Sequence, residues 1–210
     1  MKKRIAILGS TGSIGKCLID IIKKDKKNFE IILLSADENY KELLKQAKLF
    51  KVKNLVVNNI KSFNKIKKDN YAKKIKIFNN FNNFENIFRK KIDYTMNSIS
   101  GIQGLKPTIE IIKYTKKIAI ANKEAIICGW DLIKRNLDKY KTEFIPVDSE
   151  HFSIWYSLKG IHKSMIEKIY LTASGGPFLD KSFRKLNKVN IKQVTNHPNW
   201  KMGKKISTDS

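Results

Sequence analysis

The sequence predicts an α/β fold with a doubly wound parallel sheet. Two observations lead to this prediction. Short apolar runs alternate with segments of helical periodicity along most of the chain, and a glycine-rich turn follows the first apolar run. Repeated strand–helix–strand units form parallel sheets with helices on both faces. Because the alternation loosens after Val147, we predict one such domain over residues 1–147 and the beginning of a second, α+β domain over residues 148–210.

The predicted elements follow from local patterns, taken in chain order. RIAIL (4–8) is a short apolar run, typical of a strand covered on both faces. Apolar positions at helical spacing follow it, namely Ile14, Cys17, Leu18, Ile21 and Ile22. Further strands are predicted at residues 29–36, 54–57, 74–78, 93–99, 118–122, 143–147 and 169–173, and helices near residues 40–47, 106–114, 124–137 and 151–158. We interpret Phe78, Phe81 and Phe84 as a helical stripe that touches the core.

The charge of the chain is strongly basic. A net charge of +24, from 43 Lys and Arg against 19 Asp and Glu, would ordinarily indicate a nucleic-acid partner. The basic residues are dispersed in pairs along the whole chain, however, and Lys, Asn and Ile are abundant together, which fits drift towards AT-rich codons. We therefore predict no nucleic-acid partner, and a non-catalytic basic nucleotide-binding module stays as an alternative.

Cysteine usage and the apolar runs indicate the compartment. Cys17 and Cys128 are far apart and form no CxxC pair, which fits a reducing environment. The N-terminus enters a strand without the apolar region of a signal peptide, and no apolar run approaches the ~18 residues of a membrane span. We predict a cytoplasmic protein with no membrane association.

The glycine turn GSTGSIG (9–15) places Gly9, Gly12 and Gly15 between a strand and an amphipathic helix, the context that a dinucleotide-binding turn requires. Glycines let the backbone approach a pyrophosphate, and the first-turn N–H groups of the helix donate to it. Thr11 and Ser13 add hydroxyl donors. A turn that merely packs helix on strand is the alternative. The complete strand–turn–helix context favours a nucleotide and a Rossmann-like domain.

The second strand ends in Ser35-Ala36-Asp37-Glu38-Asn39. An acid at this place usually holds the ribose hydroxyls of NAD, whereas the 2′-phosphate of NADP prefers a cation. Taken alone, the acids favour NAD. The alternative is a cap, with Asp37 at the N-terminus of the helix that begins near Tyr40.

Two further polar groups follow predicted strands. Asn122, Lys123 and Glu124 come after IAIA, where Lys123 could reach a substrate oxygen and its neighbours a cofactor, or Asn122 could simply cap the next helix. Asp148 and Glu150 come after EFIPV, and in an extended backbone both carboxylates would point to one side. Two oxygen ligands suit Mg²⁺ or Mn²⁺. Capping of the helix near residues 151–158 is the alternative.

Two segments near the C-terminus of the chain could also contact ligands. Ser174-Gly175-Gly176 could form a backbone nest for an oxyanion or a phosphate, or a plain turn. HPNWKMG (197–203) contains a Trp that could close over a flat ligand, or serve as a buried anchor of a surface loop.

Five motifs now stand in order: GSTGSIG (9–15), ANKE (121–124), PVDSEH (146–151), SGGPF (174–178) and HPNWKMGKKISTDS (197–210). Together they closely resemble the 1-deoxy-D-xylulose 5-phosphate reductoisomerase family over nearly the whole chain. The resemblance implies an enzyme of non-mevalonate isoprenoid synthesis that uses NADPH and a divalent metal ion, Mn²⁺ or Mg²⁺. Such an enzyme rearranges a sugar phosphate to an aldehyde, which hydride transfer then reduces to 2-C-methyl-D-erythritol 4-phosphate. The resemblance also implies a homodimer for the full-length protein.

The resemblance further implies residue roles. Cofactor contacts would come from Gly9, Thr11, Gly12, Ser13, Ile14, Gly15, Asp37, Glu38, Asn39, Asn122, Glu124 and Gly203. Metal ligands would be Asp148 and Glu150. Substrate contacts would come from Lys123, Ser149, Glu150, Ser174, His197, Trp200 and Ser210, and Trp200 would lie in a loop that closes over the site. Lys123, Glu150 and His197 would be catalytic.

Two features depart from the family pattern. Asp37-Glu38 stand where relatives often carry Gly followed by a cation; we still predict NADPH over NADH, because the other motifs tie the chain to this reaction. The sequence stops at Ser210, whereas family members continue with a further metal carboxylate, so we expect a fragment that is inactive alone. A metal-free NAD(P) dehydrogenase of another substrate is the rival enzyme.

Overall fold

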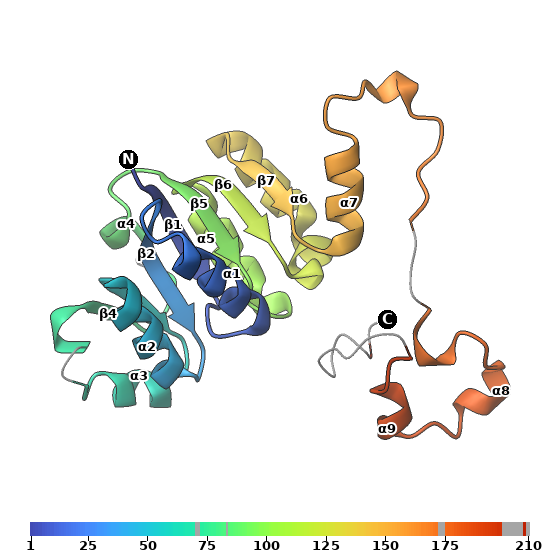
Figure 1. The fold of residues 1–210 in the computed structure, drawn as a ribbon, viewed down its shortest axis with the longest axis horizontal. Coiled ribbons are helices and arrows are strands. Elements are labelled where there is room, and N and C mark those ends of the chain that lie inside the picture. Colours follow the sequence, from blue (N-terminus) through green and yellow to red (C-terminus); the bar gives the residue numbers. More distant parts are fainter. Residues whose placement is uncertain (70–71, 83, 172–174, 199–207, 209–210) are drawn as a thin grey trace. The chain divides into compact units, whose positions relative to one another are not determined.

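A computed structural model describes residues 1–69, 72–82, 84–171, 175–198 and 208 (Figure 1). The chain forms two compact units, Met1–Ser157 and Leu158–Ser210, and each is described by itself. These units are compact bodies and not sequence domains, so the domain boundary predicted after Val147 stays a prediction.

Unit 1 is built on a parallel sheet with the strand order β4-β3-β2-β1-β5-β6-β7, which confirms the predicted fold class. The strands follow the predicted apolar runs closely, with differences of a few residues at their ends. They are β1 Lys3–Leu8, β2 Phe29–Ala36, β3 Asn54–Val57, β4 Lys76–Phe78, β5 Ile92–Asn97, β6 Thr115–Ile120 and β7 Glu143–Pro146.

Helices cover both faces of this sheet. Because successive strand residues point to opposite faces, Ile5 and Ile7 of β1 join one core and Ala6 and Leu8 the other. The first core receives α1 (Ser13–Lys24), α2 (Tyr40–Phe50) and α3 (Ile60–Ile66), and α1 and α2 lie in front of the strands in Figure 1. The second core receives α4 (Phe84–Ile87), α5 (Leu105–Ile112) and α6 (Lys123–Tyr140). The sheet is therefore doubly wound.

The phenylalanines at 78–84 do not form the predicted helical stripe. Phe78 ends β4 and Phe84 begins α4, and between them the side-chain amide of Asn79 donates to the Val57 carbonyl at 2.9 Å. That bond ties Asn79 to β3, and a local bond from Asn82 N–H to the side-chain oxygen of Asn80, at 3.0 Å, offers the backbone an alternative to a helix. Contact with the core is confirmed, since Phe84 is 2 % exposed and Phe81 packs against the same cluster.

Unit 2 contains short helical segments in its described part: η3 Lys163–Met165, η4 Gly176–Phe178, α8 Phe183–Leu186 and α9 Ile191–Val194. The strand predicted at residues 169–173 is wrong for 169–171, which have no regular structure, while 172 and 173 lie outside the described residues. A strand needs a neighbour for its backbone hydrogen bonds, and the described part of this unit provides none. The apolar sequence of residues 169–171 is therefore not enough by itself to form a strand.

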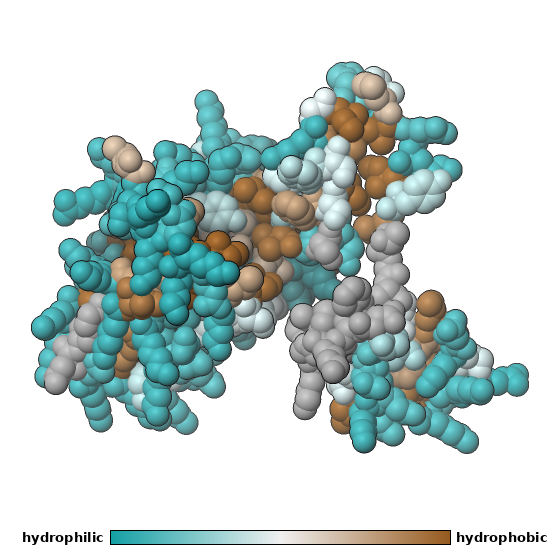
Figure 2. Space-filling view, in the orientation of Figure 1, coloured by the Kyte–Doolittle hydropathy of each residue, from teal (hydrophilic) through white to brown (hydrophobic). Residues whose placement is uncertain are grey.

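The surface agrees with the dispersed charge of the sequence. In Figure 2 hydrophilic side chains cover most of the visible face around α2 and α3. Among the described helices, we find none with the length and apolar character needed to cross a membrane.

Candidate functional site

The glycine turn lies where the strand order reverses. From β1 the chain winds outward through β2 and β3 to β4, then returns to β5 on the other side of β1 and winds outward to β7. In open α/β sheets a ligand crevice forms at this switch point, outside the carboxyl ends of the strands. Gly9 directly follows the carboxyl end of β1, so the turn faces that crevice.

Two of the three motif glycines are required by close backbone packing. Gly9 has a φ of +76°, and a Cβ on it would lie 2.9 Å from the backbone carbonyl carbon of Ser98. A Cβ on Gly15 would collide with the backbone of Gly9 and Ser10. Gly12 differs, because the nearest atom to its Cβ would be 3.5 Å away, an ordinary contact. Space beside Gly12 is therefore left open for a ligand.

The N-terminus of α1 can receive an anion. Thr11 is half-buried, and Gly12, Ser13 and Ile14 are exposed. Gly12 is the N-cap residue without a side-chain cap bond, and the first turn of α1 carries no acidic side chain. Its backbone N–H groups and the positive end of the helix dipole are thus available to a phosphate group.

Side chains from two neighbouring strands hold the turn, and sequence reasoning missed them. The Ser35 hydroxyl oxygen accepts from Gly9 N–H at 2.9 Å, and Ser10 N–H donates to the Ser35 carbonyl at 2.8 Å. On the other side the Ser98 hydroxyl donates to the Leu8 carbonyl at 2.7 Å. In the sequence these residues could have been noticed as serines near the ends of apolar runs, Ser35 in the second and Ser98 in the run at 93–99.

The end of β2 carries Asp37, Glu38 and Asn39. The cap of α2 is Asn39, whose side-chain oxygen accepts from Glu42 N–H at 3.2 Å, so the alternative of Asp37 as the cap is wrong. A cap must stand directly before the first helical turn, which Asp37 does not. The Glu38 carboxylate accepts from the Asn59 amide at 3.5 Å, next to α3.

Asn122 and Lys123 lie at the start of α6, just after β6. Asn122 is the N-cap residue but makes no side-chain cap bond; its amide donates instead to the Ile99 carbonyl. Its Oδ1 is buried and, within the described part of the chain, has no hydrogen-bond partner. Lys123 is exposed and Glu124 is half-buried. A buried acceptor without a partner is costly unless a ligand donates to it.

Asp148 and Glu150 do not have the extended geometry that we predicted. The helix α7 (Ser149–Ser157) begins between them, so Glu150 lies in its first turn. Asp148 Oδ1 accepts from His151 N–H at 2.9 Å and lies 2.6 Å from the His151 ring Nδ1. The expected convergence of the carboxylates as alternate residues of a strand is therefore wrong. The proposed cap is present, because Asp148 satisfies an N–H that has no partner inside the helix.

The predicted groups nevertheless share one edge of the sheet. The turn at Gly9, the acids after β2, Asn122 after β6 and Asp148 after β7 all follow the carboxyl ends of parallel strands. β7 is three strands from β1, about 14 Å at ordinary strand spacing. An extended ligand is needed to reach from the turn to Asp148.

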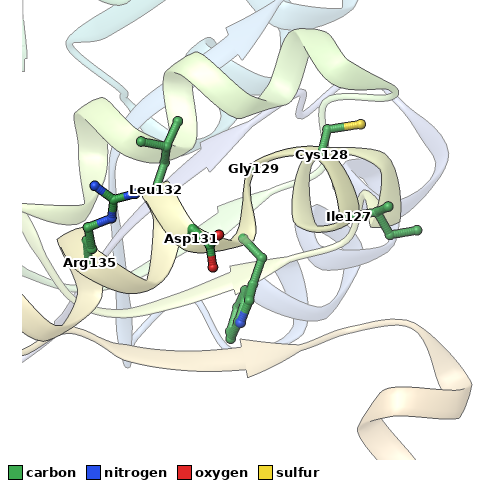
Figure 3. Close-up of a pocket in the computed structure, with 7 residues that line it drawn as sticks. Ile127, Cys128, Gly129, Asp131, Leu132 and Arg135 are labelled. Carbon is green, nitrogen blue, oxygen red and sulfur yellow. The ribbon is translucent and has the colours of Figure 1, made fainter.

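A hollow of about 320 Å³ lies elsewhere in unit 1, beside a kink of α6 (Figure 3). Gly129 has non-helical dihedral angles there, with Ile127 and Cys128 before it and Asp131 and Arg135 after it. This hollow does not contain the polar groups named above. The hollow is therefore separate from the candidate site.

Comparison with known proteins places the chain in a family. The family description "1-deoxy-D-xylulose 5-phosphate reductoisomerase" matches residues 5–129, and that of the C-terminal domain of the same enzyme matches residues 144–210. The chain belongs to the 1-deoxy-D-xylulose 5-phosphate reductoisomerase family.

Individual reductoisomerases agree with this result. The enzyme of Pelagibacter ubique is 58% identical over 99% of this chain, and that of Wolbachia pipientis from Culex pipiens is 40% identical. A solved structure of the Zymomonas mobilis reductoisomerase with NADPH has a TM-score of 0.84 at 29% identity, and covers 92% of this chain and 51% of that one. A reductoisomerase solved with NADPH, fosmidomycin and magnesium has a TM-score of 0.83 at 30% identity, over 99% of this chain and 54% of that one. The chain spans about half the length of the curated reductoisomerases it matches, 54% for the Pelagibacter enzyme.

Several residues predicted from the family resemblance have no structural description. Ser174, Trp200, Gly203 and Ser210 lie outside the described residues, and the side chain of Ser149 is not described. His197 belongs to unit 2, where it is 7% exposed.

The described residues fit a dinucleotide by their geometry and a divalent ion by the chemistry of their oxygen donors, the two groups that the reductoisomerase family implies. For a dinucleotide, the open space beside Gly12 offers room, and Asn122 Oδ1, which has no hydrogen-bond partner among the described residues, offers an acceptor. For a divalent ion, Asp148 and Glu150 supply the carboxylate oxygens that Mg²⁺ and Mn²⁺ prefer. Within the described ranges no group of three His, Cys, Asp or Glu side chains gathers closely enough to hold a metal.

Proposed function

We propose that this chain forms the cofactor-binding part and a portion of the catalytic site of a 1-deoxy-D-xylulose 5-phosphate reductoisomerase. The enzyme would convert its sugar phosphate to 2-C-methyl-D-erythritol 4-phosphate, using NADPH and a divalent metal ion. The observation that carries the proposal is the glycine turn at the strand-order switch, on the same sheet edge as Asn122, Lys123 and Asp148. Membership of the family supports it.

The cofactor would lie along this edge. Thr11, Ser13 and Ile14 would bind the pyrophosphate through backbone N–H groups and hydroxyls, with Gly9 and Gly15 letting the backbone come close. Gly12, whose N–H donates to the Gly9 carbonyl at 3.1 Å, would contact the pyrophosphate through the open space beside it. Asp37, Glu38 and Asn39 would surround the adenine ribose, and Asn122, Glu124 and Gly203 would orient the rest. Bound NADPH would supply the hydride that reduces the aldehyde.

The substrate would lie near β7. Asp148 and Glu150 would hold the divalent ion, Mn²⁺ or Mg²⁺, which polarises a carbonyl oxygen of the substrate when it is bound. Lys123 is exposed at the N-terminus of α6, where its ammonium group can bind a substrate oxygen. Ser149, Ser174, His197, Trp200 and Ser210 are proposed as further substrate contacts from the family resemblance.

The finer properties of the protein are also proposals. We infer a cytoplasmic enzyme of non-mevalonate isoprenoid synthesis, supported by two exposed free cysteines, Cys17 and Cys128, which fit a reducing compartment. A homodimer of the full-length protein, without nucleic-acid or membrane partners, rests on the family resemblance and on the dispersed charge. Light scattering of the purified full-length protein would test the dimer.

A chimera tests the activity. The part of the Pelagibacter enzyme that lies beyond its match to this chain is joined after Ser210, which gives an extended chimera. We expect the extended chimera to oxidise NADPH only with 1-deoxy-D-xylulose 5-phosphate present, to stop in EDTA, and to recover with added Mn²⁺. The 210-residue chain alone should bind NADPH without turnover.

Two outcomes would contradict the proposal. Turnover that EDTA leaves unchanged would favour a metal-free dehydrogenase. An inactive extended chimera, beside a Pelagibacter enzyme that is active in the same assay, would remove the assigned activity from this half of the chain.

A further inference from the structure

One buried amide touches the glycine turn from the side of α2. Gln46 is 3% exposed, and its neighbours on the inner face of α2 are apolar, Leu43 and Ala47 among them. Its Nε2 donates to the Ser10 carbonyl at 3.1 Å, a contact between residues 36 positions apart in sequence. The amide thus connects the middle of α2 to the turn between β1 and α1.

Packing does not explain this side chain. Its Nε2 lies 3.4 Å from Glu42 Oε1, at the edge of hydrogen-bond distance, and its Oε1 is buried with no partner in the described part of the chain. Burying an amide with an unmet acceptor costs free energy. A methionine of similar length would fill the same space without the unmet Oε1, so what the glutamine adds is its donor to the Ser10 carbonyl.

The geometry of the peptide bond relates this contact to the ligand side of the turn. The Ser10 carbonyl and the Thr11 N–H belong to one planar trans peptide, so they point in opposite directions. A bond that draws the carbonyl towards α2 therefore directs the Thr11 N–H away from α2. Thr11 is the first residue of the half-buried and exposed stretch that we assign to the pyrophosphate.

The preceding peptides are held by other groups. Gly9 N–H donates to the Ser35 hydroxyl oxygen at 2.9 Å, and Ser10 N–H donates to the Ser35 carbonyl at 2.8 Å. Ser35 thus holds the Leu8–Gly9 and Gly9–Ser10 peptides. Gln46 holds the next one, the Ser10–Thr11 peptide, which carries the Thr11 N–H.

We propose that Gln46 is a positioning residue for the cofactor pyrophosphate, which acts by holding the Ser10–Thr11 peptide. This inference rests on the proposed function, because it requires that the turn binds a dinucleotide. It predicts that the side chain affects affinity for the diphosphate and not for the adenosine part of the ligand.

The experiment compares Gln46→Met, Gln46→Glu and a matched control, Asn54→Leu, in the 210-residue chain. The side-chain amide of Asn54 also donates a hydrogen bond to a backbone carbonyl, that of Ile32 at 3.0 Å. Asn54 begins β3, so this contact lies at the amino end of that strand, whereas the glycine turn lies at the carboxyl end of β1. Dissociation constants are measured for NADPH by its fluorescence and for adenosine 2′-monophosphate, which lacks the diphosphate, by NMR titration. Melting temperatures are recorded for each variant.

We expect Gln46→Met to bind NADPH about three- to tenfold more weakly, as for one lost hydrogen bond, with little change in affinity for adenosine 2′-monophosphate. Its melting temperature should fall, because the Ser10 carbonyl loses its donor. Gln46→Glu, whose carboxylate has no donor once it is ionised, should weaken NADPH binding at least as much at a pH high enough to ionise it. Asn54→Leu should lower the melting temperature and keep the wild-type affinity for NADPH.

The result that overturns the inference is NADPH binding by folded Gln46 variants at wild-type strength, or an equal loss for both ligands. Should Gln46→Met fail to fold, the Gln46→Glu variant provides the same comparison. A wild-type chain that binds no NADPH would instead contradict the proposed function, so the two failures are distinguishable.

Discussion

Asp148 and His151 are joined by two contacts at the start of α7. Asp148 Oδ1 accepts from the His151 backbone N–H at 2.9 Å and lies 2.6 Å from the ring Nδ1 of the same residue. One carboxylate therefore caps a helix and, in the proposed function, also holds a metal ion. The two roles have different chemical requirements, since a cap needs only an oxygen acceptor, whereas a divalent ion is held more strongly by a negatively charged carboxylate than by a neutral amide oxygen.

Two substitutions of Asp148 separate these roles. Asp148→Asn keeps an acceptor for the cap, so we expect a nearly unchanged melting temperature, whereas Asp148→Ala should lose about 1 kcal/mol of stability. In the extended chimera both variants should lose more than about 100-fold in metal-dependent turnover, since changes to outer partners of metal ligands already cost 10–100-fold. Thermal unfolding and NADPH oxidation measure the two effects. Wild-type turnover by Asp148→Asn would argue against a metal ligand here.

The glycines of the turn should respond differently to alanine. A Cβ on Gly15 would collide with the backbone of Gly9 and Ser10, so Gly15→Ala should destabilise unit 1 by about 1–3 kcal/mol. A Cβ on Gly12 meets only an atom at 3.5 Å, so Gly12→Ala should stay within about 0.5 kcal/mol of wild type. Because Gly12 is exposed beside the proposed pyrophosphate, Gly12→Ala should nevertheless weaken NADPH binding. Urea unfolding and fluorescence titration test both; equal stability of the two variants would contradict the packing argument.

Sequence patterns predicted the sheet well for a physical reason. Strands covered on both faces must be apolar throughout, so runs such as those at residues 29–36 and 54–57 stand out from a lysine-rich chain. The apolar residues at 169–171 lack a partner strand within the described residues of their unit, and a single sequence does not show which strands pair.

The candidate site was less predictable in its details. The turn and the polar residues after β6 and β7 were predicted from motifs. Side chains that act over long sequence separations, Ser35 and Gln46 above all, were missed, because nothing local marks a buried amide as the partner of a distant carbonyl. Because α7 begins at Ser149, the backbone after Asp148 is helical and not extended. Strand patterns in a sequence do not locate such a boundary to a single residue.

Acid should weaken unit 1 through Asp93, far from the proposed site. A hydrogen bond from the Lys116 ammonium, at 2.8 Å, and one from Arg4 N–H, at 2.9 Å, lower the pKa of this carboxyl below its ordinary value. A depressed pKa in the folded state contributes stability above the unfolded pKa of about 3.9, and this is lost as pH falls through the folded value.

Asp93→Asn tests this contribution. We expect the variant to be less stable than wild type at pH 7, by at most about 1 kcal/mol for a partly exposed pair, with the difference shrinking as the pH falls below about 4. Urea unfolding at a series of pH values measures it. A difference that stays constant across this range would show that the carboxylate charge is not responsible.

Cofactor preference should depend on Glu38. Its carboxylate follows β2, where the family resemblance puts the adenine ribose, and it accepts a hydrogen bond from the Asn59 amide at 3.5 Å. A negative side chain near a 2′-phosphate opposes its binding. Glu38→Gln removes that charge and keeps an acceptor for Asn59, so we expect about three- to tenfold tighter binding of NADPH. NADH has no 2′-phosphate, so its affinity should stay unchanged.

The control for this variant makes the same charge change at the other end of β2. Glu30 lies at the amino end of the strand, more than about 20 Å from Glu38 at the usual rise per residue, so Glu30→Gln should alter neither affinity. Fluorescence titrations with both cofactors provide the ratio of dissociation constants. An equal gain for NADPH and NADH in Glu38→Gln would mean that the carboxylate acts on a part common to both cofactors. An equal gain in Glu30→Gln would mean that only the net charge of the chain matters.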